Sequence, residues 1–381
     1  MIITKTPYRI SFFGGGTDHP SWFKEHGGRV LATTFDKYCY ISIRHLPPFF
    51  KHKYRIVYSK IEDVSSISEI NHPAVREVLN YYKNINGLEI HHDGDLPARS
   101  GLGSSSSFTV GMINAMNALE GAYKSSYELA STAIHIEQDL IKECVGSQDQ
   151  VSAAYGGFNE IQFYKDGSFS VEPLMINFNR KKDLNEHLML FFTGVSRLSS
   201  EVAESQIANM GNCFSQMQEL YEMAKEGSSI LTKQDIPLEE FGKLLDRAWH
   251  NKKTLSNMIT NAKIDDLYKA AINAGAIGGK ILGAGGGGFV LFFVKPQDQK
   301  KVKNVLKKLT HVPFNFENTG SKIVVYHPNG FWFLLVMNYE LIKDSKIYVA
   351  GHKDLIGSEF MRFFEKNGYT HKWKKENLIK Y

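Results

Sequence analysis

The first part of the chain contains two segments in which apolar and polar positions alternate. Residues 2–12 and 29–45 are rich in β-forming side chains. In the second segment the two alternating sets are Cys39, Ile41 and Ile43 against Tyr40, Ser42 and Arg44. A period of two is typical of half-buried β-strands, so both segments are predicted strands. The glycine run at residues 14–16 predicts a turn between them.

After residue 70 the pattern changes to helical spacing and then to a glycine-rich loop. HPAVREVLNYY at 72–82 predicts a helix, and LEIHHDGDLP at 88–97 predicts a strand that leads into a loop. PARSGLGSSSS follows from Pro97, and helical spacing resumes at Phe108, Met112, Ala115, Met116 and Leu119. A glycine-rich loop is therefore predicted to open a helix.

A second helix is predicted from Ser126 to Cys144. Its apolar stripe consists of Leu129, Ala130, Ala133, Ile134, Leu140 and Ile141. Glu137 falls inside this stripe, where an unpaired carboxylate is costly. Beyond the charged NRKKDLNEH at 179–187 the pattern restarts with the strand HLMLFFTG, helical stretches between 199 and 274, and GGKILGAGGGGFVLFFV at 278–294. This last segment is typical of a loop, a glycine turn and a buried strand.

Length and composition bound the class of protein. A chain of 381 residues exceeds one ordinary core, so two or three compact units are expected. Its 43% hydrophobic and 22% charged residues indicate a globular protein. Of the net charge of +5, +3 lies in residues 338–381, where nine Lys and Arg face six Asp and Glu. The remaining +2 gives no reason to expect a nucleic-acid partner.

Cysteine spacing and hydropathy suggest where the protein works. Cys39, Cys144 and Cys213 match neither a disulfide framework nor a metal-binding spacing, which favours the reducing cytoplasm. The N-terminus lacks the apolar core of a signal peptide. The most apolar run, FWFLLVM at 331–337, is much shorter than the roughly 20 residues that span a bilayer. We therefore expect no membrane insertion.

The loop that begins at Pro97 has the features of a phosphate-binding loop. Gly101 and Gly103 let backbone N–H groups approach phosphate oxygens, and the following helix directs its positive end to the same place. Serines 104–107 add hydroxyl donors, one of which can ligate Mg²⁺. The alternative is a flexible linker, although linkers seldom lie between an apolar strand and a periodic helix. The string matches neither GxxxxGK[ST] nor GxGxxG.

Two carboxylates are candidates for chemistry. A Mg²⁺ ion held between a loop serine and Glu137 would satisfy the carboxylate on its apolar helix face, whereas a boundary position that reaches solvent is the alternative. Asp149, in VGSQDQ, lies beyond this helix in a turn from which a carboxylate can be directed into a cleft. An ordinary polar turn residue is the alternative for Asp149.

Three separated motifs resemble those of the GHMP kinases. They are TPYRISFFGGGTD at 6–18, LPARSGLGSSSS at 96–107 and GGKILGAGGGGFVLFF at 278–293, in the order of that family. The resemblance implies a two-domain α/β (α+β) fold with the active site in the interdomain cleft. The expected units are an N-terminal domain at 1–185, a C-terminal domain at 186–328, and a linker with a βα fragment at 329–381.

The resemblance also implies roles for individual residues and the use of ATP and Mg²⁺. Ser105 and Glu137 resemble the Mg²⁺ ligands, and Asp149 resembles the aspartate that orients the acceptor hydroxyl, with Arg9 keeping it ionised. Residues implied at the nucleotide are Pro97, Arg99, Ser100, Gly101, Leu102, Gly103, Ser104, Ser105, Ser106, Gly285, Gly286 and Gly287. Residues implied at the acceptor are Gly15, Gly16 and Asp18.

The first motif departs from that of galactokinases, because GGGTDH replaces a GEHTDY-like string. RISFFGGGTD, DKYCYISIR and HDGDLPARSGLGSSSSFTVG look most like the branch that phosphorylates the anomeric hydroxyl of heptose 7-phosphates for GDP-heptose synthesis. A phosphorylated acceptor needs fixed positive charge, and Arg99, Arg197 and Lys37 are candidates. A kinase for a free sugar such as fucose, or a non-catalytic regulator that binds sugar and nucleotide, remains an alternative.

The C-terminal segment has a different resemblance. Residues 343–369 look like the opening strand, turn and helix of a GDP-fucose synthase-type reductase, but Asp354 stands between Gly351 and Gly357 where that family has its middle glycine. One βα unit cannot build a dinucleotide site, so we expect no activity from it. The expected partners are a sugar phosphate and ATP, and the sequence leaves a homodimer open.

Overall fold

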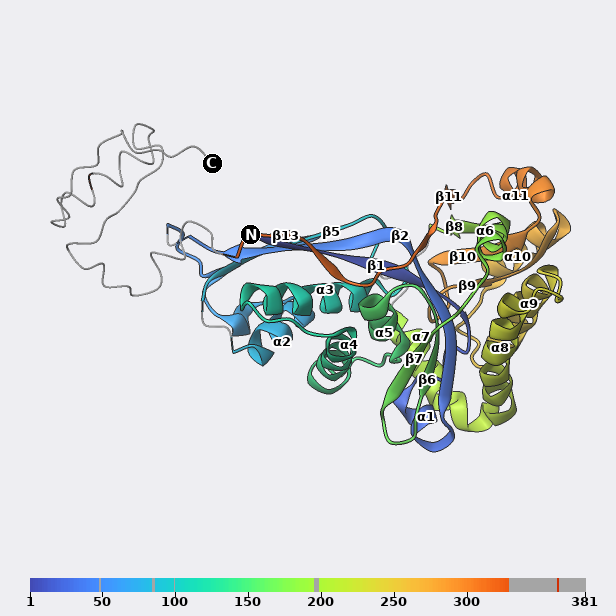
Figure 1. Ribbon diagram of the computed structural model, residues 1–381, viewed down its shortest axis with the longest axis horizontal. Helices are drawn as coiled ribbons and strands as arrows, with labels where there is room; N and C mark the ends of the chain where they lie inside the picture. The colour runs from blue at the N-terminus through green and yellow to red at the C-terminus, as the bar shows by residue number, and fades with distance from the viewer. Residues whose placement is uncertain (48, 84–85, 99, 195–198, 329–361, 363–381) are drawn as a thin grey trace. The chain divides into compact units, whose positions relative to one another are not determined.

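The computed structural model describes residues 1–47, 49–83, 86–98, 100–194, 199–328 and 362 (Figure 1). Residues 1–328 form one compact unit, and residues 329–381 form a second. The second unit contains the fragment that resembles a reductase and the apolar run at 331–337, so both features lie outside the described residues, apart from Arg362. Everything that follows concerns residues 1–328.

A nine-stranded sheet forms the larger part of this unit. The predicted strands at 2–12 and 29–45 are confirmed as β1 (Ile2–Phe13) and β2 (Gly28–His45), which pair antiparallel. The strand order is β13-β1-β2-β5-β3-β4, and β12 and β6 also pair with β2, while β7 pairs with β6. The remaining bounds are β3 (Tyr54–Val57), β4 (Ile61–Val64), β5 (Leu88–Gly94), β6 (Phe158–Phe163), β7 (Phe169–Pro173), β12 (Phe316–Glu317) and β13 (Lys322–Tyr326).

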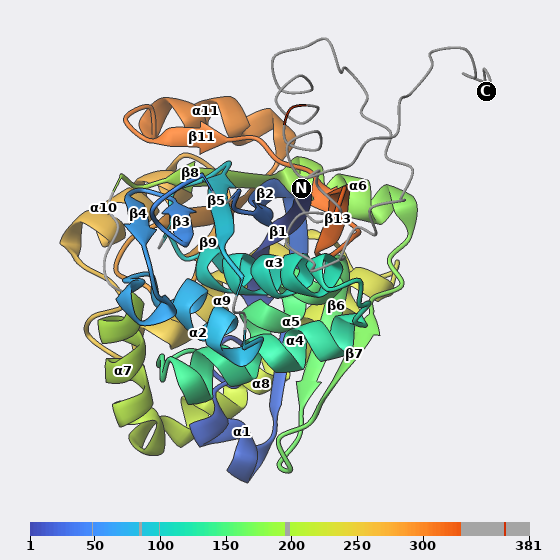
Figure 2. The same cartoon turned by 90° about the vertical axis from the view of Figure 1, so that its left-hand side faces the viewer.

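Helices cover one face of this sheet. The predicted helix after the glycine-rich loop is α3 (Ser104–Leu119), which is almost entirely buried because it lies between β1 and β2 on one side and α4 on the other (Figure 2). The others are α2 (Pro73–Tyr81), α4 (Ser126–Ile134) and α5 (Gln148–Tyr155). A capping box between Ser125 and Glu128 begins α4. Helix α1 (Pro20–His26) follows the first glycine run.

A second sheet of four strands has the order β11-β8-β10-β9. Its strands are β8 (Leu188–Phe192), β9 (Ala276–Ile281), β10 (Phe289–Val294) and β11 (Thr310–Val312). All six side chains of β10 are buried, as its unbroken apolar sequence predicts. The accompanying helices are α6 (Phe178–His187), α7 (Ser199–Asn209), α8 (Phe214–Thr232), α9 (Glu239–Lys253), α10 (Ala262–Asn273) and α11 (Gln299–Val305).

Helices α8 and α9 join the two sheets. Helix α8 packs on β1 and β2 and also on α9, which covers β9. Phe241 of α9 meets Phe12 and Phe13 edge to face, with ring centroids 5.2 and 5.1 Å apart. Aromatic pairs in this arrangement contribute about 0.5–1.5 kcal/mol beyond the burial of their area. The far end of β1 is thereby fixed against the second sheet.

Two features of the chain path bear on the predicted boundary between the two domains at residue 185. After β11 the chain returns to the nine-stranded sheet, where β12 pairs with β2 and β13 pairs with β1. The residues of both strands nevertheless belong to the predicted C-terminal domain. The predicted division at residue 185 falls inside α6, one element before the second sheet begins. The division into domains at 185 stays a prediction.

The predicted helix from Ser126 to Cys144 is shorter than expected. Helix α4 ends at Ile134, a π-helical turn occupies His135–Leu140, and the chain is not helical at Cys144. A π turn inserts a residue into the helical register, so later side chains rotate to a different face. Leu140, which the pattern placed in the apolar stripe, is consequently exposed.

Within the described ranges, no helix is both long enough and apolar enough to cross a membrane. All three cysteines are free, with Cys39 and Cys213 buried.

The pairing of β13 with β1 predicts how far the chain can be shortened. A protein ending at Pro328 should melt within a few degrees of the full chain, because it keeps the β1–β13 ladder and the hydrogen bond from the His327 backbone N–H to the Met1 carbonyl. A protein ending at residue 320 loses this strand and should melt clearly lower, because β1 becomes an unpaired edge. Thermal unfolding of the three proteins checks this, and equal stability of both shortened forms would contradict it.

Candidate active site

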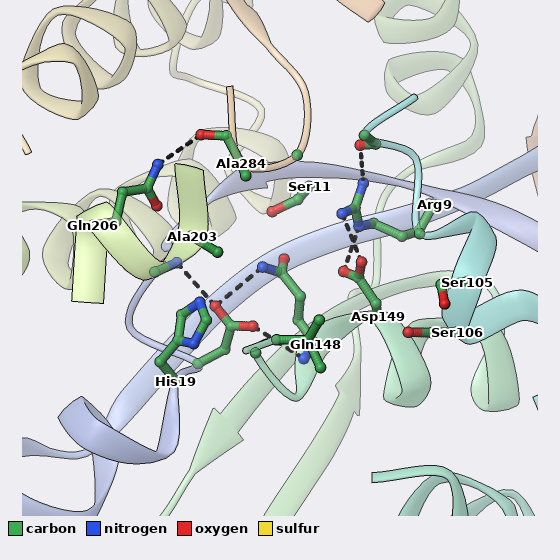
Figure 3. A pocket seen from close by; sticks show the side chains of 18 of the residues that line it. Arg9, Ser11, His19, Ser105, Ser106, Gln148, Asp149, Ala203, Gln206 and Ala284 are labelled. Atoms are coloured by element: carbon green, nitrogen blue, oxygen red, sulfur yellow. Dashed lines mark hydrogen bonds and ion pairs between the residues drawn. The ribbon is translucent and has the colours of Figure 1, made fainter. Parts of the chain in front are cut away.

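A cavity of about 340 Å³ lies where segments of both sheets meet. The turn after β1, the loop before α3, the segment before α5 and the glycine turn before β10 all contribute to its wall, together with α7 and α9 (Figure 3). Seven of its lining side chains are charged or can be charged: Arg9, Asp18, His19, Glu143, Asp149, Lys252 and Lys280.

The central contact of the cavity is an ion pair between Arg9 and Asp149. Nε and Nη2 of Arg9 donate to Oδ1 and Oδ2 of Asp149 at 2.7 and 2.9 Å, and Nη1 donates to the carbonyl of Gly101 at 2.6 Å (Figure 3). The Arg9 side chain is 5% exposed and that of Asp149 is 25% exposed, so the carboxylate remains open to the cavity. A two-point contact of this kind fixes the orientation of the carboxylate as well as its position.

The predicted phosphate loop and the glycine turn of the third motif are in direct backbone contact. A Cβ atom on Gly101 would lie 2.3 Å from the carbonyl oxygen of Leu282, and one on Gly283 would lie 2.4 Å from the Cα of Gly101. Both residues also have positive φ angles, of 84° and 77°. Only glycine fits this crossing, which explains why both motifs need it at these positions.

The N-terminus of α3 opens into the cavity beside this crossing. Gly103, with a φ of 75°, precedes the first helical residue, and Ser104, Ser105 and Ser106 line the wall. The helix has 16 residues, so its first turn presents the positive end of a helix dipole to the cavity. Glycine turns, hydroxyls and a helix N-terminus at one cavity wall are suited to binding the phosphates of a nucleotide.

Glu137 lies behind the phosphate loop and is completely buried. Ser106 Oγ and Gln150 Nε2 both donate to its Oε2, at 2.8 and 2.5 Å. Its other oxygen, Oε1, is buried without a hydrogen-bond partner in the described part of the chain. Burial raises the pKa of Glu137 to about 7, against the opposing effect of the hydrogen bonds from Ser106 and Gln150.

These observations fit the binding of Mg²⁺ near Glu137. A buried carboxylate oxygen without a partner is a vacant ligand position for a hard cation. In the described ranges no group of three or more His, Cys, Asp and Glu side chains is placed to hold a metal. The usual Mg²⁺ site of phosphoryl-transfer enzymes needs only one or two carboxylates, which act together with substrate phosphates.

Asp18 closes the cavity on the side of the first motif. Its Oδ1 accepts from the N–H of Gly16 at 2.9 Å and from Nε2 of Gln148 at 3.1 Å, and its Oδ2 accepts from the N–H of Gln148 at 3.1 Å (Figure 3). The side chain is 1% exposed. Asp18 therefore fixes the turn at Gly16 relative to the start of α5, and little of its carboxylate is left for a ligand.

Two buried lysines on the cavity wall were not predicted from the sequence. Lys252, near the end of α9, donates to the carbonyl of Gly283, and Lys280, on β9, donates to the carbonyl of Phe12 at 2.7 Å. Burial, with Arg9 nearby, lowers the pKa of Lys252 to about 8, and burial lowers that of Lys280 well below its usual value. Burial also lowers the pKa of His19.

The structure brings ten of the twenty predicted site residues together at the cavity wall. Those that line the cavity are Arg9, Gly15, Gly16, Asp18, Gly101, Gly103, Ser104, Ser105, Ser106 and Asp149. The loop serine that hydrogen-bonds Glu137 is Ser106, whereas Ser105 is exposed at the cavity wall. Arg99 and Arg197 lie outside the described residues.

Other predicted site residues have supporting positions. Pro97 and Ser100 form a turn in which the Ser100 hydroxyl donates to the Pro97 carbonyl, and Leu102 is buried. Of the third glycine run, Gly283 and Ala284 line the cavity, while Gly285 and Gly286 pack on Ile259, and Gly287 follows them. Lys37 is paired with Asp36 and is not part of the cavity wall.

The raised pKa of Glu137 predicts a pH-dependent stability. Its folded pKa of about 7 exceeds the usual 4.5, so its contribution to stability is fully present below about pH 4.5 and is lost as the pH rises through 7. In metal-free solution, Glu137→Gln should therefore gain stability over the wild type between pH 5 and pH 8, by an amount on the order of a few kcal/mol. Thermal unfolding with a chelator present, with exposed Glu172→Gln as the control, measures this. A stability difference that does not change with pH would contradict it.

Comparisons with known proteins agree with the geometry. Residues 69–157 match the GHMP kinases N terminal domain, and residues 233–311 match the GHMP kinases C terminal domain. A D-glycero-alpha-D-manno-heptose 7-phosphate kinase of Campylobacter jejuni is 29% identical over 325 residues, which cover 81% of this chain and 93% of that protein. A bifunctional fucokinase/GDP-fucose pyrophosphorylase of Arabidopsis thaliana is 27% identical over 81% of this chain, which spans only 31% of that protein.

A solved structure gives the same answer for the fold. The crystal structure of a D-glycero-D-manno-heptose 1-phosphate kinase from Bacteriodes thetaiotaomicron aligns with a TM-score of 0.70 at 25% identity, and the alignment covers 86% of this chain and 100% of that one. The two-domain α/β kinase fold, the order of the three motifs and both family matches lead to one assignment. This chain carries the N-terminal and C-terminal domains of the GHMP kinases.

Proposed function

We propose that this protein is an ATP-dependent sugar kinase that phosphorylates the anomeric hydroxyl of a heptose 7-phosphate, yielding the 1,7-bisphosphate for GDP-heptose synthesis. The observation that carries the proposal is the Arg9–Asp149 ion pair, which lies in the cavity where the α3 N-terminus and the glycine turns meet. The match to both GHMP kinase domains supports phosphoryl transfer from ATP. The heptose phosphate kinases among the relatives support the acceptor class.

The side chains of the cavity suit in-line phosphoryl transfer. Asp149 Oδ atoms are fixed by Arg9 and open to the cavity, so they can accept a hydrogen bond from the acceptor hydroxyl. The hydroxyl oxygen forms a bond to the γ-phosphorus of ATP, the bond from that phosphorus to the β–γ bridging oxygen breaks, and ADP leaves. The hydroxyl proton passes to Asp149 or to solvent. Such transfer depends mainly on positioning and charge neutralisation.

The phosphate loop and Glu137 complete the nucleotide site. N–H groups at the start of α3 and the adjacent glycines would hold the nucleotide phosphates. Glu137, with Ser105 as the sequence implies or with Ser106 as its hydrogen bond suggests, would hold Mg²⁺. When bound, this ion supplies neutralisation of the phosphate charge.

The relatives differ in the position of the phosphate on the heptose. One relative acts on a heptose 7-phosphate, and the solved neighbour is called a heptose 1-phosphate kinase. The fucokinase relative makes a fucose kinase the second candidate function. The same proposal includes a cytoplasmic location and a homodimer.

Asp149→Asn should retain ATP binding and lose about 10²- to 10⁴-fold in turnover, the usual range for a positioned acid–base group. The control is Asp166→Asn, because Asp166 is exposed in the turn between β6 and β7. Nucleotide binding and ADP release are measured on the same preparations. Turnover of Asp149→Asn within a few-fold of wild type would make this residue structural. If the wild-type protein binds ATP but consumes none with any sugar, the result would favour the alternative of a non-catalytic regulator that binds sugar and nucleotide.

Heptose 7-phosphate should be preferred over the free heptose, heptose 1-phosphate, fucose and mannose. The preference for the phosphorylated sugar should weaken at high salt, because recognition of a phosphate is partly electrostatic. Values of kcat/KM for the five acceptors at low and high ionic strength check this. Equal efficiency with fucose and heptose 7-phosphate would instead support the free-sugar kinase.

A further inference from the structure

Lys252 and Lys280 approach the cavity from different elements of the second sheet region. Lys252 is near the end of α9 and Lys280 is on β9, and their relative exposures are 8% and 6%. Each ammonium group has three N–H donors. Each donates to one backbone carbonyl, that of Gly283 for Lys252 and that of Phe12 for Lys280. In the described part of the chain neither lysine forms an ion pair, although a buried ammonium is costly without one.

Nearby carboxylates offset only part of this cost, because each is already hydrogen-bonded to other partners. Both oxygens of Asp149 accept from Arg9, and Asp18 is bound by Gly16 and Gln148. Arg9 adds a third cation to the region. Burial, and next the charge of Arg9, lower the pKa of Lys252 to about 8, while Asp18 and Asp149 act in the opposite direction. An anion bound here would favour the charged form of both lysines.

An unpaired hydroxyl lies next to the same place. Ser11 is 5% exposed and lines the cavity, and its Oγ is buried without a hydrogen-bond partner among the described residues. Figure 3 shows this hydroxyl pointing into the space bounded by Ala284 and Gln148. Ser11 directly precedes Phe12, whose carbonyl accepts from Lys280, so the hydroxyl belongs to the residue next to the one that holds the ammonium.

We propose that Lys252, Lys280 and Ser11 form a phosphate-binding subsite, separate from the loop that opens α3. Two buried ammonium groups and a hydroxyl on one cavity wall match the oxygens of a phosphate group. The phosphate is either the group transferred from ATP or the phosphate already carried by the acceptor. The inference rests on the proposed kinase function, which supplies both sources.

A binding experiment tests the subsite without requiring turnover. The protein is saturated with MgADP, so that the phosphate loop is occupied, and inorganic phosphate is then titrated while thermal unfolding is followed. Wild type should be stabilised by phosphate, and Lys252→Met with Lys280→Met should raise the phosphate concentration needed by about 10- to 100-fold. Lys243→Met is the matched control, because Lys243 lies on the same helix with its side chain 64% exposed.

The outcomes separate this inference from the proposed function. Wild type that is not stabilised by MgADP would contradict the kinase assignment. An unchanged phosphate response in the double variant would overturn the subsite, as would wild-type kinetics in that variant. Met is chosen because an apolar side chain of similar length removes the buried charge without leaving a cavity. If the double variant does not fold, Ser11→Ala and the two single lysine variants give the same test.

Steady-state kinetics with two acceptors identify the source of the phosphate. If the subsite binds the acceptor phosphate, the lysine variants should raise KM for heptose 7-phosphate about 10- to 100-fold and leave KM for free heptose unchanged. If it binds the transferred group, kcat should fall by a similar factor with both acceptors. Either result supports the subsite.

Discussion

The guanidinium of Arg9 lies between the phosphate loop and the first turn of α5, and it donates to both. Its backbone N–H also donates to the carbonyl of Leu102, so the loop is held by β1 through two contacts. Because Arg9 is buried, these contacts are little weakened by solvent. A single side chain of the central sheet therefore contacts both Asp149 and the loop that precedes α3.

A second constraint brings the other half of the site into place. Gly101 and Gly283 touch backbone to backbone, and Phe241 packs on Phe12 and Phe13 at the end of β1. The backbone contact between the two glycines and the aromatic packing at the end of β1 thus position the second sheet beside the cavity. This arrangement also brings Lys252 and Lys280 to the wall of the cavity that Asp18 and Asp149 line.

The sequence predicted the parts of the site that depend on local motifs. The glycine-serine loop follows from the local sequence pattern, and Asp149 follows from its turn together with the resemblance to GHMP kinases. Arg9 and Asp18 follow from that resemblance alone, and the structure places all of them together. Lys280 was within the third motif, yet a lysine in a strand has no local signal that it is buried. Lys252 lies in the last turn of α9, and basic residues are common in the last turn of helices. Only its tertiary contact with Gly283 distinguishes it from Lys253.

The π turn shows why an apolar pattern alone did not give the details at Glu137. The pattern placed Glu137 on the buried face correctly, but regular spacing also buried Leu140, which is exposed. Which loop serine contacts Glu137 depends on the same irregular turn. Register changes of this kind arise from tertiary contacts, which periodicity does not encode.

The pairing of β1 with β13 has a consequence for synthesis of the chain on the ribosome. One edge of β1 acquires its partner only when residues 322–326 have been made, about 300 residues after β1 itself. At roughly 5–20 residues per second, that edge waits on the order of 15 to 60 seconds. An apolar strand with open N–H and C=O groups is a template for pairing between nascent chains. Chaperones that shield nascent chains therefore have a defined segment to protect during this interval.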